Sequence, residues 1–229
     1  MKLGLNNEYD IVCGYEAGCL GYSLYNQLTG AGVKCVILAT TTMLTPQGNR
    51  VKTDARDALM IAQCLSYGGY RAVYIPTEED DSVEEYLRMR DDHKLALKKM
   101  KQQINAFCLR HGHHYTGTKW TIAHWKWLKK LEVSEMYRET LDEYMASYEE
   151  QTAKIERFDT RVEEIASQER YQEEVKKLTC FLGIKTHTAL SLIVETGDFE
   201  RFAKGNTYAA FLGLAPGENS SGEHINRTG

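Results

Sequence analysis

The sequence has few prolines and no long apolar run, and both absences limit the fold classes that are possible. It contains three prolines in 229 residues, which favours long uninterrupted helices because proline breaks the interior of a helix. No apolar run approaches the ~18 residues that a membrane-spanning helix requires, and the first ten residues lack the apolar core of a secretion signal. With 42% hydrophobic and 26% charged residues, we expect a cytoplasmic globular protein of one or two domains.

Two kinds of motif are also missing. The six cysteines form no CxxC pair, which argues against a zinc ribbon or a disulfide framework and indicates reduced thiols. No GxGxxG or P-loop glycine pattern follows a predicted strand, which argues against a doubly wound nucleotide-binding protein. The net charge of −4 argues weakly against nucleic-acid binding, but the charges are strongly segregated along the chain.

The first third of the sequence has the pattern of an α/β fold. Short β-rich or apolar runs alternate with segments of helical spacing, and glycines follow the helical segments. One of these runs, VKCVILA, is continuously apolar, as in a buried parallel strand. The predicted order is strand, helix, strand, helix, strand, at residues 10–16, 17–32, 33–39, 52–69 and 72–76. This order predicts a parallel sheet with right-handed crossovers.

The rest of the chain is predicted to be helical. One long helix starts at residue 78 and breaks at Gly112, and a loop and a short aromatic helix fill residues 113–131. Residues 132–174 hold an apolar seam in alternating steps of three and four, interrupted once by Gln151, which predicts a coiled coil or a long helical hairpin. The seam residues are Tyr137, Leu141, Tyr144, Tyr148, Ile155, Phe158, Val162 and Ile165. Residues 175–229 read as three or four short helices and a polar loop.

Residues 93–131 hold the charge anomaly of the chain. They carry nine Lys or Arg and no Asp or Glu, with five histidines and all three tryptophans. Cations neutralise phosphates and aromatic rings stack on bases, so we expect nucleic acid here, with single-stranded or structured RNA favoured. The alternative is a solvated helix face with tryptophans in a core. The candidate nucleic-acid-binding residues are Lys94, Lys98, Lys101, Arg110, His111, Lys119, Trp120, Trp125, Lys126, Lys129 and Lys130.

Three carboxylates are candidate metal ligands. Glu16 ends the first predicted strand, where open α/β sheets place ligands. Asp54 and Asp57 lie three residues apart at the start of a predicted helix, so their side chains share one face. Carboxylate oxygens suit Mg²⁺ or Mn²⁺, and the combination resembles the acidic cluster of RNase H-like nucleases. The alternative is ordinary helix capping, with Asp54 as the N-cap and Asp57 as its capping-box partner.

Two features of the C-terminal region are also candidates. Ser220 and Ser221 lie in the sequence NSSG with His224 and Arg227 nearby, and a serine in such a loop can act as a nucleophile when a base or metal deprotonates it. The alternative is that Ser, Asn and Gly are simply the common residues of loops. LGIKTHTAL (182–190) resembles a helix-hairpin-helix turn that contacts a phosphate, although Lys185 replaces the usual second glycine.

Several of these segments, in this order, resemble a known family. The segments are YEAGCLGYSLYNQL (15–28), RVKTDARDAL (50–59), LRHGHHYTGTKWTIAHWKWL (109–128), IVETGDFERF (193–202) and AAFLGLAPGENSSG (209–222). They are similar to the Piv-type DEDD transposases of the one-ten insertion-sequence family, the bridge-RNA-guided recombinases. The resemblance covers essentially the whole chain.

The resemblance implies a fold, a reaction and partners. It implies an RNase H-like (RuvC-like) catalytic domain over residues 1–131, a coiled coil over 132–174 and a small helical transposase domain over 175–229. Glu16, Asp54 and Asp57 match the second, third and fourth acidic ligands of Mg²⁺ or Mn²⁺, and Ser221 fits the nucleophilic serine best, with Ser220 as the fallback. DNA, a structured guide RNA and a homodimer or tetramer through the coiled coil are the implied partners.

Two departures from the family pattern qualify this implication. The family's first Asp lies on a strand well before YEAG, and no such strand precedes Glu16; Asp10 lies on the same predicted strand as Glu16 and cannot replace it. The family also continues beyond the point that corresponds to Gly229. We therefore expect a chain truncated at both ends, with weak metal binding and little activity alone. The rival hypothesis is an RNA- or DNA-binding dimer without catalysis.

Overall fold

The computed structural model describes residues 11–19, 21–40, 43, 53–215, 217, 218, 227 and 228. The chain forms two compact units, Met1–Ile75 and Pro76–Gly229, and each is described by itself. We expected boundaries after residues 131 and 174, whereas the compact units divide after residue 75. The physical reason is that the long helix that begins at residue 78 packs along the helix that begins at residue 135. A boundary after residue 131 would separate two helices that share their cores.

The first unit is built on a two-stranded parallel sheet. β1 (Val12–Glu16) pairs with β2 (Lys34–Leu38), with Gly14 opposite Val36. α1 (Ser23–Gly30) connects the two strands, and α2 (Asp54–Tyr67) follows them. This confirms the predicted strand–helix–strand order and a parallel α/β pairing. α1 is shorter than expected: it begins at Ser23, after a turn in which Gly21 has a φ of 53°.

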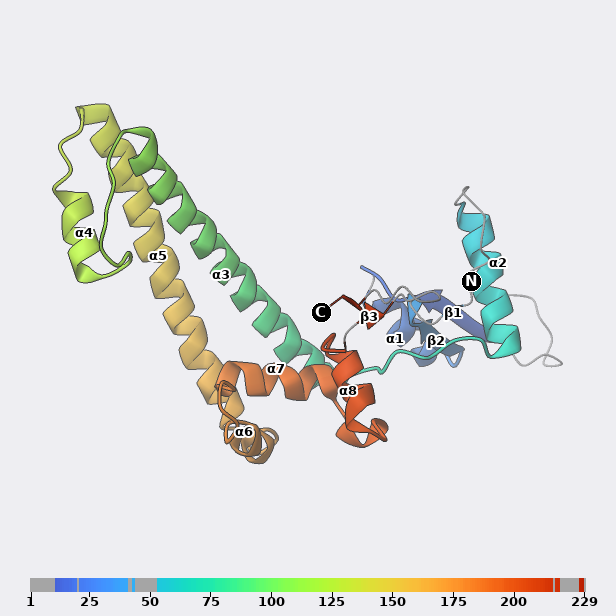
Figure 1. Cartoon of the computed structure of the whole chain (residues 1–229). Coiled ribbons are helices and arrows are strands. Elements are labelled where there is room, and N and C mark those ends of the chain that lie inside the picture. Colours follow the sequence, from blue (N-terminus) through green and yellow to red (C-terminus); the bar gives the residue numbers. More distant parts are fainter. Residues whose placement is uncertain are drawn as a thin grey trace. The chain divides into compact units, whose positions relative to one another are not determined.

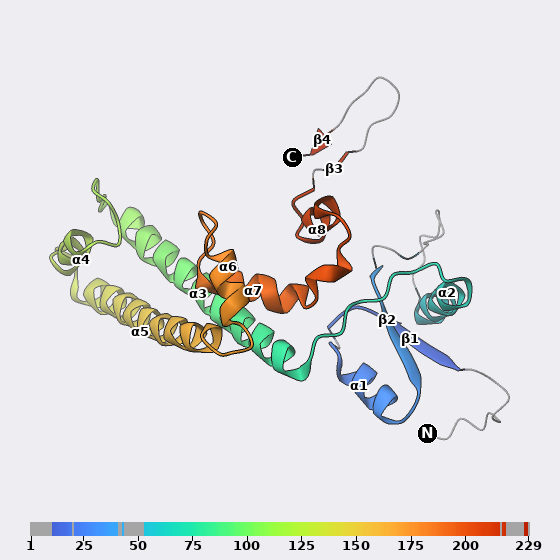
Figure 2. The same ribbon diagram turned by 90° about the horizontal axis from the view of Figure 1, so that it is seen from below.

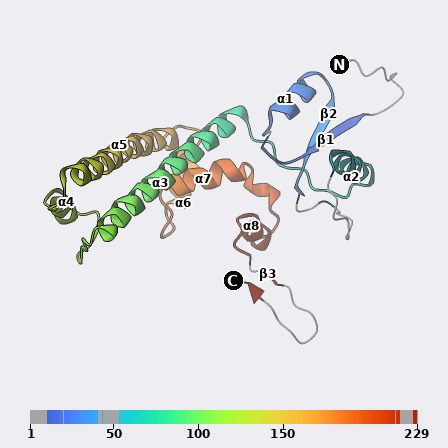
Figure 3. The same cartoon turned by 90° about the horizontal axis from the view of Figure 1, so that it is seen from above.

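The two helices of this unit cover opposite faces of the sheet, as the strands between α1 and α2 in Figures 2 and 3 show. A Cβ added to Gly14 would lie 2.8 Å from Leu38 Cδ1 and 2.9 Å from Leu65 Cδ1, so this side of β1 faces α2. The next side chain points to the other face. There the Tyr15 hydroxyl donates to the Gly21 carbonyl (3.0 Å) and accepts from the Tyr25 amide of α1 (3.3 Å).

The third predicted strand, at residues 72–76, is wrong. The structure has only one bridge there, between Leu38 and Ala72, and it is antiparallel. Two backbone bonds make it, from the Ala39 amide to the Arg71 carbonyl (2.9 Å) and from the Val73 amide to the Ile37 carbonyl (2.8 Å). Pro76 has no amide to continue the pairing, and the next helix begins two residues later. Too little chain is left for a strand.

The second unit is a long antiparallel helical hairpin (Figure 1). Its helices are α3 (Glu78–Arg110) and α5 (Glu135–Ala166), and the short helix α4 (Ile122–Lys129) lies in the connection beside their far end. Thr77 caps α3 by accepting from the Asp80 amide. The predicted break near Gly112 is confirmed: α3 ends at Arg110, and Gly112 has a φ of 77°.

The apolar seam of α5 faces α3 of the same chain. Leu141 and Met145 pack with Ile104 and Phe107 in one cluster, and Val162 and Ile165 pack with Val83 and Leu87 in another. Between them Gln151, the polar interruption of the seam, donates through Nε2 to the His93 carbonyl (2.9 Å). The predicted helical hairpin is therefore what forms. Four of the eight seam residues, Leu141, Ile155, Val162 and Ile165, are buried inside the chain, and assembly of two or four copies through this segment stays a prediction.

Short helices complete the second unit, as predicted. They are α6 (Gln172–Leu178), α7 (Thr186–Thr196), the 3-10 helix η2 (Phe199–Arg201) and α8 (Gly205–Phe211). Buried residues of α7, among them Ala189, Leu190 and Ile193, join the core between α3 and α5. A two-residue antiparallel pair follows, between β3 (Gly217–Glu218) and β4 (Arg227–Thr228).

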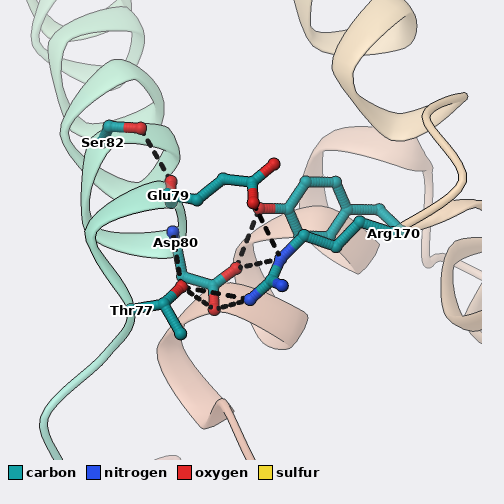
Figure 4. A network of polar contacts seen from close by, with 6 residues as sticks. Thr77, Glu79, Asp80, Ser82 and Arg170 are labelled. Atoms are coloured by element: carbon teal, nitrogen blue, oxygen red, sulfur yellow. Dashed lines mark hydrogen bonds and ion pairs between the residues drawn. The ribbon is translucent and has the colours of Figure 1, made fainter.

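A polar network around the buried Asp80 joins the start of α3 to the turn after α5 (Figure 4). Arg170 Nε donates to one oxygen of Asp80 (3.0 Å), and the Tyr171 hydroxyl donates to the same oxygen (2.8 Å). The Thr77 hydroxyl donates to the other oxygen (2.8 Å). Burial alone would raise the pKa of Asp80, but these hydrogen bonds outweigh burial and lower it. Burial and the Asp80 charge raise the pKa of Tyr171 to about 12.

Candidate functional site

The first candidate site is formed by three carboxylates of the sheet unit. Glu16 is the last residue of β1 and is exposed. Because side chains alternate along a strand, Glu16 points to the same face as Gly14, which is the face that α2 covers. Asp54 and Asp57 lie in the first turn of α2. The three carboxylates therefore belong to one side of the sheet, as the metal hypothesis requires.

The capping alternative for Asp54 and Asp57 is wrong. The N-cap of α2 is Thr53, whose hydroxyl accepts from the Arg56 amide (3.4 Å). With Thr53 at the N-cap, the capping-box position is Arg56, so neither Asp serves the cap. Both carboxylates still gain from the helix dipole at this end of α2. Among the described residues, no hydrogen bond or ion pair reaches the carboxylates of Glu16, Asp54 and Asp57.

The structure does not gather these carboxylates into a closed ligand set. Across the described ranges, no three His, Cys, Asp or Glu side chains form a group that could hold a metal ion. Asp57 is half-buried, while Glu16 and Asp54 are exposed. Convergence of the three residues on one ion stays a prediction.

The serine candidates fall outside the described residues. Ser220, Ser221 and His224 are not described, and only the backbone of Arg227 is. The pairing of Glu218 with Arg227 holds the two ends of this segment next to each other. Residues 182–190, which resemble a helix-hairpin-helix turn, run from the turn between α6 and α7 into α7, and Gly183 in this turn has a φ of 91°. Its contact with a phosphate stays a prediction.

The second candidate site is the cationic surface at the far end of the hairpin, which we call the basic tip. It comprises the second half of α3, the connecting loop and α4. Lys94, Lys98 and Lys101 follow one another at steps of four and three, which sets them along one side of α3. The other basic members are Arg110 at the end of α3, Lys119 in the loop, and Lys126, Lys129 and Lys130 on and after α4.

The cations of the basic tip are largely available to a ligand. All of them are exposed except Lys101, which is half-buried. In the part of the chain that the structure describes, none of them forms an ion pair with a carboxylate. Lys101 instead lies over the rings of Trp120 (5.5 Å) and Tyr148 (5.8 Å). The arrangement presents many unneutralised positive charges to solvent.

The aromatic candidates pack against rings of α5. Trp120 stacks on Tyr148 of α5, with ring centroids 5.3 Å apart, and Trp125 lies 5.0 Å from the same ring. His111 packs 4.1 Å from the ring of Tyr137. These rings are half-buried or exposed beside the core of the tip. Both tryptophans are only partly buried beside that core, and their stacking on bases stays a prediction.

A small hollow beside this aromatic packing was missed by sequence reasoning. Its lining includes Asn105, His113, His114, Tyr115 and Lys119. At its base His124 is 1% exposed and accepts from the Trp120 amide through Nδ1 (3.1 Å). Burial and the nearby charge of Lys119 lower the pKa of His124. Histidine-rich composition was the available signal, but only the fold around Gly112 shows which histidine is buried.

Part of the chain matches a known protein family. Residues 175–229, from α6 to the last residue, match the model of the "Transposase IS116/IS110/IS902 family". Within the described residues, no helix is long and apolar enough to cross a membrane.

Curated relatives extend the similarity to most of the chain. The chain is 36% identical over 201 residues to "Transposase for insertion sequence element IS1533" of Leptospira borgpetersenii, covering 86% of this chain and 58% of that protein. It is 32% identical over 216 residues to y4qE of Sinorhizobium fredii (strain NBRC 101917 / NGR234), covering 94% and 52%. It is 24% identical over 214 residues to "Transposase for insertion sequence element IS1111A" of Coxiella burnetii, covering 86% and 54%. The chain spans about half the length of the curated relatives it matches.

Proposed function

We propose that this chain is part of an insertion-sequence transposase, an enzyme that cuts and rejoins DNA. The observation that carries the proposal is the similarity to insertion-sequence transposases, which runs through both compact units. The family match over residues 175–229 adds to it at the C-terminal end. The three carboxylates on one side of the sheet supply a place for the chemistry.

The donor set fits a hard divalent cation. Glu16, Asp54 and Asp57 offer only oxygen ligands, and Mg²⁺ and Mn²⁺ prefer oxygen. Thr53 relieves both aspartates of capping α2, which leaves their oxygens available. A bound divalent ion would stabilise charge on a phosphodiester oxygen during cleavage. With three carboxylates in the proposed set, we expect weak metal binding.

Ser221 is the proposed nucleophile, with Ser220 as the fallback. In this scheme the serine Oγ attacks the phosphorus of a DNA phosphodiester, and the bond to one sugar oxygen breaks. The released hydroxyl takes the proton, and the phosphate stays linked to the serine. Attack by the hydroxyl of a second DNA end then releases the serine and rejoins the strand.

The basic tip is the proposed binding surface for RNA, and the guide RNA of the resemblance is its expected ligand. Lys94, Lys98, Lys126, Lys129 and Lys130 are exposed and lack carboxylate partners among the described residues. Each such cation that meets a phosphate releases counterions and adds to the affinity at low salt. Trp120 and Trp125 contribute by shaping this surface through their contacts with Tyr148.

The test of the enzyme hypothesis combines metal binding with covalent trapping. The full chain is titrated with Tb³⁺ as a luminescent probe for oxygen-ligated cation sites. Asp57→Asn should weaken binding at least tenfold, while Asp142→Asn, an exposed aspartate on α5, should leave it unchanged. DNA that carries the ends of the host element is then incubated with the protein and Mg²⁺, and the mixture is denatured. A protein–DNA adduct that disappears in Ser221→Ala supports the serine mechanism.

A second function is favoured by one observation. No metal ligand group forms among the described residues, whereas the basic tip is fully formed. A non-catalytic RNA- or DNA-binding protein derived from such an element would show salt-dependent binding by the wild type. It would show no specific Tb³⁺ site and no adduct. Salt-dependent RNA binding by the wild type without a Tb³⁺ site or an adduct thus separates this function from the enzyme.

A further inference from the structure

Two cysteines of the sheet unit lie directly opposite each other. Cys13 of β1 and Cys35 of β2 are register partners in the parallel pair. Partners in a parallel pair point to the same face of the sheet, and Tyr15, two residues beyond Cys13, points toward α1. The two thiols therefore lie side by side on the face opposite Gly14 and Glu16. The proposed function uses neither of them.

The surroundings give the two thiols different access. Cys13 is half-buried and Cys35 is buried. Burial, and then the neighbouring Cys13, raises the pKa of Cys35, so Cys35 remains largely a thiol while a reagent from solvent meets Cys13 first. The other four cysteines, 19, 64, 108 and 180, pair with no cysteine in the sheet register.

The separation of adjacent strands suits a bond between these sulfurs. Neighbouring strands lie about 4.7–4.9 Å apart, and disulfide-bonded residues have Cα atoms about 4.4–6.8 Å apart. The backbone spacing therefore already lies in the range of a disulfide. The side chains must only approach slightly, since disulfide Cβ atoms lie about 3.5–4.5 Å apart.

We propose that Cys13 and Cys35 are a reactive dithiol that closes to a disulfide when the protein reacts with hydrogen peroxide. In the first step the sulfur of Cys13 attacks a peroxide oxygen, the O–O bond breaks and a sulfenic acid forms with release of water. In the second step the sulfur of Cys35 attacks Cys13 Sγ and the S–O bond breaks with release of a second water. Two thiols are oxidised, and one hydrogen peroxide is reduced to two waters.

The experiment treats the full chain with hydrogen peroxide and maps its thiols by mass. We expect loss of two hydrogen atoms and a link between the tryptic peptides 3–34 and 35–50. Peptide 3–34 contains both Cys13 and Cys19, so Cys19→Ser is the matched control. The link should persist in Cys19→Ser and disappear in Cys13→Ser, with unchanged far-ultraviolet circular dichroism.

A second reagent keeps the proposal testable if one variant fails to fold. A trivalent organoarsenical joins two neighbouring thiols with release of one water and needs no oxidant. It should bind one to one in the wild type and in Cys19→Ser, and binding should fall more than tenfold in Cys13→Ser. The proposal is overturned if peroxide only adds oxygen to Cys13, if the link starts from Cys19, or if the disulfide joins two chains.

Discussion

The sheet unit and the hairpin unit differ in how they use their side chains. The described residues of the hairpin unit form clusters of eleven and six buried residues, whereas those of the sheet unit form one cluster of three, Leu38, Met43 and Cys64. Buried charges of the hairpin are paired, as Asp80 is with Arg170 and Arg90 with Asp159. The hairpin thus pairs its buried charges within its own fold. The sheet unit instead holds carboxylates, Glu16, Asp54 and Asp57, that have no hydrogen-bond or ion-pair partner among the described residues.

The largest expected effect concerns the independence of the two units. Leu141 lies in the tip core and Leu38 in the sheet core, and neither is exposed. Truncating either to Ala should cost about 2–5 kcal/mol of the unfolding free energy of its own unit. In a calorimetric scan Leu141→Ala should move only the hairpin transition and Leu38→Ala only the sheet transition. A single transition that both variants shift equally would contradict the two-unit description.

The next largest effect is the loss of stability when the buried charge of Asp80 in the hairpin is removed. Asp80→Asn removes the charge that Arg170 and Tyr171 face, and we expect a loss of about 1–3 kcal/mol at neutral pH. Arg161→Ala, which breaks the exposed pair with Glu164, is the control and should cost less than about 1 kcal/mol. Chemical denaturation of both variants against the wild type measures the difference.

The pH dependence of this effect has a definite sign. The folded pKa of Asp80 is lowered, so its contribution is complete above the unfolded value of about 3.9 and is lost as the pH falls through the folded pKa. The gap in stability between the wild type and Asp80→Asn should therefore be constant near neutral pH and shrink in acid below that value. A gap that grows on acidification would show that the Asp80 charge is not stabilising.

The sequence predicted helices better than it predicted sheets or side-chain partners. The helix of the α5 seam and the helix break near Gly112 depend on neighbours along the chain, so the sequence alone could predict them. The failed strand at residues 72–76 depended on a distant partner, β2, whose edge accepts only one bridge. The cap by Thr53 was missed because Asp54 is an equally good capping residue in isolation. Gln151 was recognised as an interruption, but its bond to the His93 carbonyl joins residues 58 apart.

A smaller effect sharpens the comparison at the basic tip. Changing Lys126, Lys129 and Lys130 to Ala should lower the slope of log K against log salt for single-stranded RNA by about 2, since each phosphate contact contributes about 0.7. Lys129→Ala alone should lower the slope by about 0.7. Its control is Lys154→Ala, on the acid-rich helix α5, which should leave the slope unchanged. Trp125→Ala should weaken binding mainly by loosening the tip, which near-ultraviolet circular dichroism would register. A flat slope in the wild type would remove the basic tip as an RNA surface.

The smallest change in unfolding free energy is expected on removing the carboxylates of the sheet unit, because they make no hydrogen bond or ion pair with the described residues. Glu16 is exposed and has no ion-pair partner among the described residues, so Glu16→Gln should change the unfolding free energy by no more than about 0.5 kcal/mol. Asp57→Asn should lose only the helix-dipole contribution of about 0.3–1 kcal/mol, whereas Thr53→Ala, which removes the cap, should cost about 0.5–2 kcal/mol. Denaturant titrations of the three variants give this order. Removing a carboxylate that serves a ligand should change the unfolding free energy little. If Glu16→Gln costs more than Thr53→Ala, Glu16 serves the fold, and the metal proposal loses a free ligand.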